Sequence, residues 1–339
     1  MSEHLLEIKG LKTHFATDEG MVHAVDGVDL FIDRGETLGV VGESGCGKSV
    51  TALTVMKLLA IPPARIVAGE ILWQGLDLIP LAADAMQRIR AKEIAMVFQE
   101  PMTSLNPVYT IGEQVGEVIR LHQKLGRRAA LERAVDMLKL VHISNPERRV
   151  HDYPHQFSGG MRQRVMIAMA LSCSPKLLIA DEPTTALDVT IQAQILDLLG
   201  ELKSRMGMAV MLITHAMGVI AETAQRVVVM YAGKVVEEAP VRELFGSPRH
   251  PYTQGLIRSI PRIDTAAIRK TRLEAIAGIV PSLLEPAPGC RFAPRCRFAC
   301  DACTSHTPAL REIVAGHKVA CILAEEAGLR APVPASLPL

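Results

Sequence analysis

The feature that most constrains this chain is the octapeptide from Gly42 to Ser49, which reads Gly-Glu-Ser-Gly-Cys-Gly-Lys-Ser. It fits the pattern of a phosphate-binding loop, in which four variable residues separate a glycine from Gly-Lys-Ser/Thr. The apolar run at 37–41 predicts a buried strand before the loop, and residues 50–59 favour a helix after it. A strand, a glycine-rich loop and a helix in this order are the context in which such a loop binds a nucleoside triphosphate.

The chemistry of this loop follows from its residues. The glycines allow successive backbone N–H groups to turn toward an anion, and the following helix adds positive partial charge at its N-terminus. Lys48 is placed to reach the β- and γ-phosphates, and the Ser49 hydroxyl is placed to bind Mg²⁺. The predicted nucleotide-binding residues of this stretch are Gly42, Glu43, Ser44, Gly45, Cys46, Gly47, Lys48, Ser49 and Val50.

The bulk properties exclude several classes of protein. The 339 residues carry a net charge of +1 and only 4% aromatic side chains, which argues against a nucleic-acid partner. The N-terminus shows no signal peptide, and no apolar run is long enough to span a membrane. We therefore expect a cytosolic chain whose seven cysteines are free thiols or metal ligands rather than disulfides.

The order of the predicted elements indicates an α/β fold. Polar and apolar residues alternate over 5–36, as in half-buried antiparallel strands, whereas residues 111–143 have helical spacing and predict an inserted helical region. Residues 227–237 predict a hairpin with a glycine turn. From about residue 247 proline becomes frequent, which predicts a loop-rich extension, and the tail at 331–338 is expected to be disordered.

Polar residues end three of the predicted buried strands. Gln99 follows the run at 94–98, the pair Asp181 and Glu182 ends the next run, and His215 follows residues 209–214. Such strand ends are where α/β sheets place ligand contacts, although each residue taken alone is also compatible with an ordinary strand end. Asp181 is suited to binding Mg²⁺, and Glu182 is suited to polarising an attacking water. Four such residues on parallel strands would converge on one crevice.

The residues alone leave two interpretations open at each of two further places in the sequence. Ser158, Gly159 and Gly160 precede a predicted helix and offer a second anion-binding helix start, or simply an N-cap. Phe15 can stack on a nucleobase or pack in the core.

In chain order, these motifs resemble those of the ATP-binding subunit of an ABC transporter, over roughly residues 5–250. The resemblance implies a P-loop NTPase (RecA-like) core with an N-terminal antiparallel β subdomain, an inserted helical subdomain and a loop-rich C-terminal extension. It implies ATP-binding over 1–250, a helical subdomain at about 100–172, and the extension over 251–339. The implied role of Phe15 is adenine stacking, and Ser49, Gln99 and Asp181 are implied to bind Mg²⁺. Gln99 and His215 are implied to sense the γ-phosphate, and Glu182 is the implied catalytic residue. Ser158, Gly159 and Gly160 correspond to the signature loop, and Asp188 corresponds to the D-loop.

The finer match is to the oligopeptide/dipeptide importers, on the stretches 99–107, 157–164, 250–253 and 289–296. The signature departs from the common form because Met161 replaces glutamine, and Ala216 stands where aspartate often follows the switch histidine. Neither change removes an atom that touches phosphate.

The resemblance implies an ATPase that drives peptide import from the cytoplasmic face of the inner membrane. It implies a second ATPase subunit, often a different chain, two membrane permease subunits and an extracytoplasmic peptide-binding protein. Nickel importers resemble this subfamily too, so a nickel importer is one alternative. A non-transport ABC ATPase is another, although the single phosphate loop and the lack of heptads favour a transporter.

The cysteines of the extension form a separate motif. Cys290, Cys296, Cys303 and Cys321 follow a C-x₅-C-x₆-C-x₁₇-C pattern, with Cys300 as an extra thiol. Four thiolates in a proline-rich segment could hold a soft metal centre, and this spacing fits zinc ribbons poorly. The family resemblance implies a [4Fe-4S] cluster with a structural role. Reduced structural thiols are the alternative.

Overall fold

The computed structural model describes residues 4–99, 104–185, 187–260, 276–284, 286 and 288–325. The chain divides into two compact units. The first comprises residues 1–5, 32–37 and 77–213, and the second comprises residues 6–31, 38–76 and 214–339. Each unit is described by itself below. The tail at 331–338, predicted to be disordered, and the first residues of the predicted helical subdomain, 100–103, lie outside the described residues.

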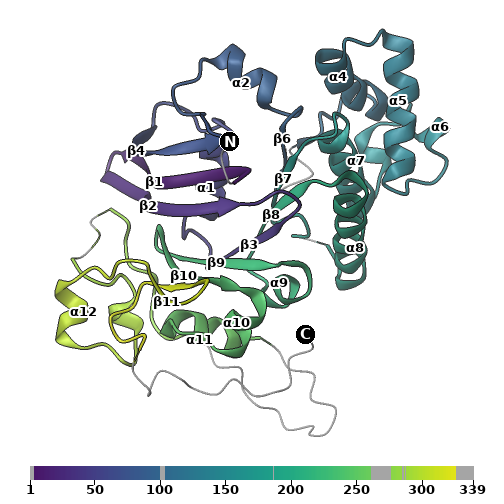
Figure 1. Cartoon of the computed structure of the whole chain (residues 1–339). Helices are drawn as coiled ribbons and strands as arrows, with labels where there is room; N and C mark the ends of the chain where they lie inside the picture. The colour runs from purple at the N-terminus through teal and green to yellow at the C-terminus, as the bar shows by residue number, and fades with distance from the viewer. Residues whose placement is uncertain are drawn as a thin grey trace, which may run out of the picture. The chain divides into compact units, whose positions relative to one another are not determined.

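The second unit contains the antiparallel strands predicted near the N-terminus (Figure 1). They form a four-stranded sheet in the order β2-β1-β4-β5, in which β1 pairs antiparallel with β4. Residues along β1 alternate mainly between buried and more exposed positions, which is the pattern that favours a sheet with one covered face. The strands are β1 (Leu6–Thr17), β2 (Gly20–Ile32), β4 (Ala64–Trp73) and β5 (Leu76–Asp77).

A second group of strands in this unit positions the phosphate loop. Its order is β11-β12-β10-β9-β3. β3 is parallel to β9, and the pairs β9–β10, β10–β12 and β11–β12 are antiparallel. All five residues of β3 are buried, as its uninterrupted apolar run predicts. The strands are β3 (Thr37–Val41), β9 (Arg226–Tyr231), β10 (Lys234–Pro240), β11 (Arg311–Val314) and β12 (His317–Val319).

The helices of the second unit are short. A Cβ at Gly39 of β3 would lie 2.7 Å from Ile220 Cδ1, so only glycine allows α9 to pack this closely against the strand. The helices are α1 (Lys48–Val55), α9 (Met217–Thr223), α10 (Val241–Gly246), α11 (Pro251–Arg258) and α12 (Asp301–Ser305), and a 3₁₀ turn η2 covers Ala293–Arg295.

The C-terminal extension is mostly loop in its described part, as predicted, yet it also contributes regular structure. β12 pairs with β10, where Glu237 lies opposite Val319, and β11 extends the sheet by one further strand. These two strands were not predicted from the sequence.

The first unit contains three parallel strands, β6, β7 and β8, in the order β8-β7-β6. All their residues are buried, which explains why each reads as a continuous apolar run. Because the strands are parallel, their carboxyl ends lie at the same edge, as predicted for the polar residues that follow them. The strands are β6 (Ile94–Val97), β7 (Leu177–Asp181) and β8 (Ala209–Thr214).

The predicted helical region is present in the first unit, where α4 packs against α5 (Figure 1). Thr110 starts α4 with a reciprocal capping box to Glu113, and Gly207 ends α8 in a left-handed conformation. None of the helices in the described ranges is both long and apolar enough to cross a bilayer. The helices are α2 (Ala83–Ile89), α4 (Ile111–Gln123), α5 (Arg127–Leu140), α6 (Pro146–Arg149), α7 (Gly159–Leu171) and α8 (Val189–Met206), and η1 covers Pro154–Gln156.

Candidate functional site

The predicted phosphate loop connects buried β3 to α1, as its sequence requires. Gly47 has φ of 103°, and a Cβ there would lie 2.5 Å from the Ala24 carbonyl oxygen. A Cβ at Gly42 would lie 2.2 Å from the Met230 carbonyl oxygen. These two positions therefore require glycine for their close backbone contacts, whereas Ser44 and Gly45 at the tip are exposed.

Lys48 lies inside the curve of this loop. Its side chain is buried, and Nζ donates to the carbonyl oxygens of Gly42 at 2.7 Å and Glu43 at 3.1 Å. Ser49 and Val50 follow in the first turn of α1, whose N-terminus contributes positive partial charge. Burial raises the pKa of the Cys46 thiol, which stays protonated. The loop thus presents one ammonium and a helix N-terminus to an anion.

Glu43 is anchored on both its backbone and its side chain. Its N–H donates to the Tyr252 hydroxyl at 2.8 Å, and its carboxylate accepts two hydrogen bonds from Arg295, at 2.6 and 3.0 Å. Tyr252 and Arg295 lie in stretches that resemble the peptide importers, but the resemblance assigned neither residue a role. A signal was available, since Arg291 and Arg295 are spaced four residues apart between two cysteines.

In the first unit, Gln99 and Glu182 come together as the parallel strands predict. Gln99 Nε2 donates to Glu182 Oε2 at 3.1 Å, and the Thr185 hydroxyl donates to the same oxygen at 2.9 Å. Asp181, the residue before Glu182 in the sequence, is the last residue of β7 and is buried. Glu182 itself has φ of 46°, and its N–H donates to the Ile213 carbonyl. Thr185 was not among the predicted site residues.

Ser158 and Asp188 each cap a helix. The Ser158 hydroxyl accepts from Met161 N–H at the start of α7, and the Asp188 carboxylate accepts from Ile191 N–H at the start of α8. Gly159 and Gly160 form the first turn of α7, where a Cβ on Gly160 would lie 2.7 Å from Ile191 Cγ2. The N-cap role of Ser158 is therefore present, and both Ser158 and Gly159 are exposed.

The other two predicted contacts belong to the second unit. His215 follows β8 and is exposed. Phe15 lies on β1 opposite Ala64 and is half-buried, so part of its ring is accessible.

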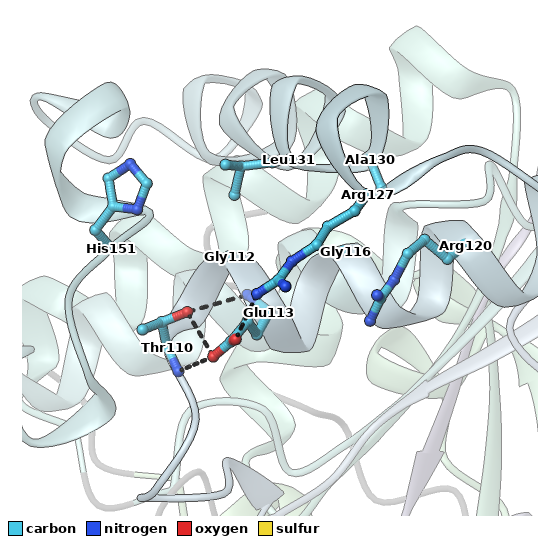
Figure 2. A pocket seen from close by; sticks show the side chains of 9 residues that line it. All are labelled: Thr110, Gly112, Glu113, Gly116, Arg120, Arg127, Ala130, Leu131 and His151. Atoms are coloured by element: carbon cyan, nitrogen blue, oxygen red, sulfur yellow. Dashed lines mark hydrogen bonds and ion pairs between the residues drawn. The ribbon is translucent and has the colours of Figure 1, made fainter.

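A pocket of about 280 Å³ lies in the helical region (Figure 2). Glu113 faces Thr110 and Arg127 across it, and the Arg127 Nη2 to Glu113 Oε1 distance is 3.3 Å. Its wall contains small residues of α4, and His151 lies at one side. The lining residues are Thr110, Gly112, Glu113, Gly116, Arg120, Arg127, Ala130, Leu131 and His151.

Several cysteines of the extension lie close to one another. Cys290 N–H donates to the Cys303 carbonyl at 2.8 Å, and Cys300 Sγ lies 3.6 Å from Cys303 Sγ. Burial, together with electrostatic interaction with three neighbouring thiols, raises the pKa of Cys321 to about 11. Those three thiols are Cys290, Cys296 and Cys303.

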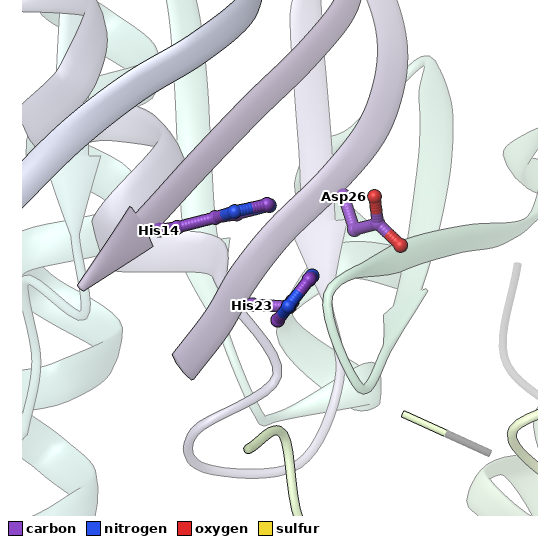
Figure 3. Close-up of side chains that lie close together, drawn as sticks. All are labelled: His14, His23 and Asp26. Carbon is purple, nitrogen blue, oxygen red and sulfur yellow. The ribbon is translucent and has the colours of Figure 1, made fainter. Parts of the chain in front are cut away.

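A compact group of a different kind lies on β1 and β2, where His14, His23 and Asp26 point toward one another (Figure 3). Their ligand-type atoms all lie within 4.8 Å. The Asp26 carboxylate, however, already contacts Lys12, Lys234 and Arg291, at 3.3, 3.4 and 2.5 Å. Burial and the neighbouring His23 lower the pKa of His14. With three cations around one carboxylate, this group is better explained as an anchor for Arg291 than as a metal site.

Two family models match the chain. The ABC transporter model matches residues 25–185, and the model for the oligopeptide/dipeptide transporter C-terminal region matches residues 236–303. They cover the phosphate loop, Gln99, Asp181, Glu182 and much of the extension.

Similar proteins cover nearly the whole chain. The "Probable peptide ABC transporter ATP-binding protein y4tR" of Sinorhizobium fredii is 56% identical over 317 residues, which is 94% of each chain. The "Oligopeptide transport ATP-binding protein AppD" of Bacillus subtilis is 51% identical, over 96% of this chain and 98% of the relative.

Solved structures share the fold. The ATP-binding cassette MJ0796, in a dimeric post-hydrolysis state bound to ADP and Pi, matches with a TM-score of 0.62 and 29% identity, over 70% of this chain and 99% of the other. The protein cbiO1 from Clostridium perfringens, part of the ABC transporter complex cbiONQ, matches with a TM-score of 0.61 and 27% identity, over 72% and 91%. The α/β, P-loop NTPase fold predicted from the sequence is thereby confirmed.

Proposed function

Because the chain belongs to the ABC transporter ATP-binding proteins, in the branch with the oligopeptide/dipeptide C-terminal region, we propose that it hydrolyses ATP to power the import of di- or oligopeptides. The observation that most directly supports the chemistry is the hydrogen-bonded group of Gln99, Glu182 and Thr185 at the end of β7. The peptide cargo is supported by the extension and by the names of the relatives.

The phosphate loop binds the ATP phosphates. Lys48 exchanges its two carbonyl partners for the β- and γ-phosphates, and the N-terminus of α1 adds favourable dipole charge. Phe15 offers the exposed part of its ring to the adenine. Oxygen atoms of Ser49, Gln99 and Asp181 match the hard ligands that Mg²⁺ prefers, and the buried Asp181 carboxylate fits a cation well. Bound Mg²⁺ would neutralise phosphate charge.

Hydrolysis depends on positioning an attacking water. Glu182 accepts two hydrogen bonds on Oε2, which fixes the direction of its carboxylate. The carboxylate can then accept a hydrogen bond from the water and polarise it. His215 donates to the γ-phosphate oxygen, where negative charge is concentrated. Positioning and charge stabilisation supply most of the catalysis in phosphoryl transfer.

A complete site requires a second ATPase subunit, which we propose is a different chain of the same family. The amides of Gly159 and Gly160 at the start of α7, with the Ser158 hydroxyl, cap the γ-phosphate held by the partner's phosphate loop. Asp188 lies at the start of α8 and contributes to the same interface. The dimeric state of the similar cassette MJ0796 supports this pairing.

Two membrane permease subunits dock on the helical region, close to the Gln99 loop. Val108 is 72% exposed and Tyr109 is 53% exposed, and both directly precede Thr110, which lines the pocket at the start of α4. Exposed apolar side chains around a pocket are typical of a docking site for a helix. We therefore place the chain on the cytoplasmic face of the inner membrane, as a peripheral subunit supplied with cargo by an extracytoplasmic peptide-binding protein.

The extension binds a [4Fe-4S] cluster through Cys290, Cys296, Cys303 and Cys321. A tetrahedral zinc ion, with Zn–S bonds of about 2.3 Å, would bring its sulfurs to about 3.8 Å from one another. Among the described residues, no three cysteines have their sulfurs within 4.8 Å of one another, yet the four thiols interact electrostatically. This wider spacing fits a multinuclear cluster better than one ion. When bound, the cluster would hold the loops of the extension together.

Anaerobic purification of the full chain tests the cluster. A brown protein with about four iron atoms per chain is expected. Iron-free protein from a host that makes such clusters would contradict the proposal, and stoichiometric zinc would replace it with a zinc site.

The cargo is tested with the complete transporter in proteoliposomes. We expect ATP-dependent accumulation of labelled di- and oligopeptides in the presence of the peptide-binding protein, and no accumulation of ⁶³Ni²⁺. The lysine variant Lys48→Ala is the control, since it lacks the phosphate contact but retains the rest of the assembly. Nickel uptake without peptide uptake would contradict the peptide assignment.

A further inference from the structure

The segment Cys290–Cys296 of the extension contacts the phosphate loop directly. It carries two arginines, Arg291 and Arg295, on either side of Phe292. Both guanidinium groups are largely buried, with 7% and 4% of the side chain exposed. Buried arginines require specific partners, because an unpaired buried charge is costly.

Arg295 uses all of its donor directions. Nη1 donates to Glu43 Oε2 at 2.6 Å and to the Tyr231 hydroxyl at 3.3 Å. Nη2 donates to Glu43 Oε1 at 3.0 Å and to the Ile276 carbonyl at 3.3 Å, and Nε donates to the Ala277 carbonyl at 3.0 Å. The two parallel bonds to Glu43 form the bidentate arrangement that gives arginine–carboxylate pairs their strength. Hydrogen bonding to Glu43 also raises the pKa of Arg295.

Glu43 transmits this contact to the centre of the loop. Its carboxylate is held by Arg295, its N–H by the Tyr252 hydroxyl at 2.8 Å, and its carbonyl accepts from Lys48 Nζ at 3.1 Å. Glu43 is therefore the residue through which the extension meets the lysine that binds phosphate.

Arg291 makes a second, parallel connection. Nη2 lies 2.5 Å from Asp26 Oδ2 on β2, and Nη1 donates to the Ala232 carbonyl in the turn between β9 and β10. The next residue of that turn, Gly233, donates its N–H to the Cys46 carbonyl of the phosphate loop at 2.9 Å. The extension thus reaches the loop at two places, directly at Glu43 and through the turn of Ala232 and Gly233 at Cys46.

Phe292, which lies between the two arginines in the sequence, is buried. Its ring packs against Tyr231 at 5.2 Å and Tyr252 at 5.4 Å between centroids. The aromatic contacts and the two arginine anchors fix the segment on the same unit that carries the loop.

We propose that Arg295 is a positioning residue of the ATP site, which holds Glu43 and thereby keeps the phosphate loop in its nucleotide-binding shape. The inference rests on the proposed function of that loop. If only a fraction of the molecules has the competent loop, the apparent dissociation constant rises by the inverse of that fraction. Loss of the fork, meaning the two parallel hydrogen bonds from Arg295 to the Glu43 carboxylate, therefore weakens ATP binding, although Arg295 does not touch the nucleotide.

Nucleotide binding by the full-length chain tests this role, with fluorescent mant-ATP and mant-AMP as the probes. Arg295→Gln is expected to raise the Kd for mant-ATP about tenfold. Binding of mant-AMP should change less than twofold, because AMP lacks the β- and γ-phosphates that the loop holds. A general loss of structure would weaken both probes alike. Arg295→Lys retains the charge but not the fork, and it should recover only part of the affinity.

The matched control is Arg297→Gln, which removes the same charge two residues away. Arg297 is exposed and stacks on Phe298, 4.7 Å from its ring centroid, and it lies outside the phosphate loop. We expect its Kd for mant-ATP to equal that of the unmodified chain.

Glu43→Gln alone and combined with Arg295→Gln completes a double-mutant cycle. The two losses should be strongly non-additive, since either change breaks the same fork. Glu43→Gln leaves every residue of the extension in place, so it reports on the fork even if Arg295→Gln folds poorly. Normal mant-ATP affinity in both single variants would overturn the positioning role alone, whereas failure of the unmodified chain to bind mant-ATP would contradict the proposed function itself.

Discussion

At the scale of single residues, two neutral donors orient the carboxylate of Glu182. Gln99 Nε2 and the Thr185 hydroxyl both donate to Oε2, at 3.1 and 2.9 Å. Two donors on the same oxygen restrict the rotation of this carboxylate. Thr185 is therefore expected to position the catalytic group without touching ATP.

Thr185→Val tests this role, because valine has nearly the same shape but lacks the hydroxyl. We expect kcat to fall about tenfold, which corresponds to about 1.4 kcal/mol in the barrier, with the Kd for ATP unchanged. Thr184→Val is the matched control from the same loop and should retain the original kcat. A Thr185→Val variant with unchanged turnover would show that Gln99 alone suffices to orient Glu182.

His250 makes stability depend on pH. Burial lowers its pKa from 6.5 to about 4, and the opposing influence of Glu237 is smaller. Between pH 6.5 and pH 4, His250 is therefore protonated in the unfolded chain but neutral in the folded chain. The free energy of unfolding consequently falls as the pH drops from 6.5 toward 4. At pH 5 this single group is expected to cost about 2 kcal/mol relative to pH 7.5.

Urea unfolding at pH 7.5 and pH 5.0 measures this cost. His250→Gln keeps an acceptor for Tyr252 N–H but cannot titrate. Its loss of unfolding free energy between the two pH values should be about 2 kcal/mol smaller than that of the unmodified chain. Equal losses in both proteins would show that His250 is not the group responsible.

Residues whose role depends on their neighbours in the sequence were predictable. Residues whose role depends on contacts with distant parts of the sequence were not. Lys48 and Ser49 follow from their place in an eight-residue motif. Tyr252 and Arg295 contact Glu43 across 209 and 252 positions of sequence, and no periodicity or local spacing predicts such a pair. Both residues lie in stretches that resemble the peptide importers, but only the fold reveals what they bind.

At the scale of elements, strands buried on both sides were the most predictable. β3, β7 and β8 read as continuous apolar runs because both faces of each strand are covered. β11 was missed, since it is short and mostly exposed and so has no apolar pattern to detect. β12 has only three residues and is defined by its pairing with β10.

The start of α7 has two roles that can be separated experimentally. Ser158 caps the helix, and we propose that it also contacts ATP held by the partner subunit. Ser158→Ala should cost about 1 kcal/mol of stability as a lost cap. It should also weaken ATP-induced pairing of the ATPase subunits by at least tenfold, measured without permeases by light scattering.

Thr110→Ala is the control for this prediction, because Thr110 caps α4 in the same way. It should lose about the same stability but pair normally. Equal pairing defects in the two variants would indicate that Ser158 acts only as a cap.

At the scale of the whole molecule, we propose that each ATP site needs groups from two subunits. The phosphate loop and the start of α7 belong to different compact units of the chain. In the proposed pair, the loop of one subunit is completed by the α7 start of the other. The isolated chain should therefore bind ATP but hydrolyse it slowly.

A preparation shown to be monomeric by light scattering tests this dependence. Its turnover is expected to rise at least tenfold when the partner ATPase and the permeases are added, because the missing signature residues complete the site. Full turnover by the monomer, unchanged on adding the other subunits, would contradict the pairing.

The most direct test of the account is ATP turnover by the complete transporter containing Glu182→Gln. The amide cannot accept a proton or polarise water as a carboxylate does, so we expect turnover to fall by at least a factor of about 100. ATP binding should persist, and the closed, ATP-bound pair should accumulate. Turnover and peptide uptake at the unmodified rate would remove Glu182 from the mechanism and contradict the assignment of this chain as the hydrolysing subunit.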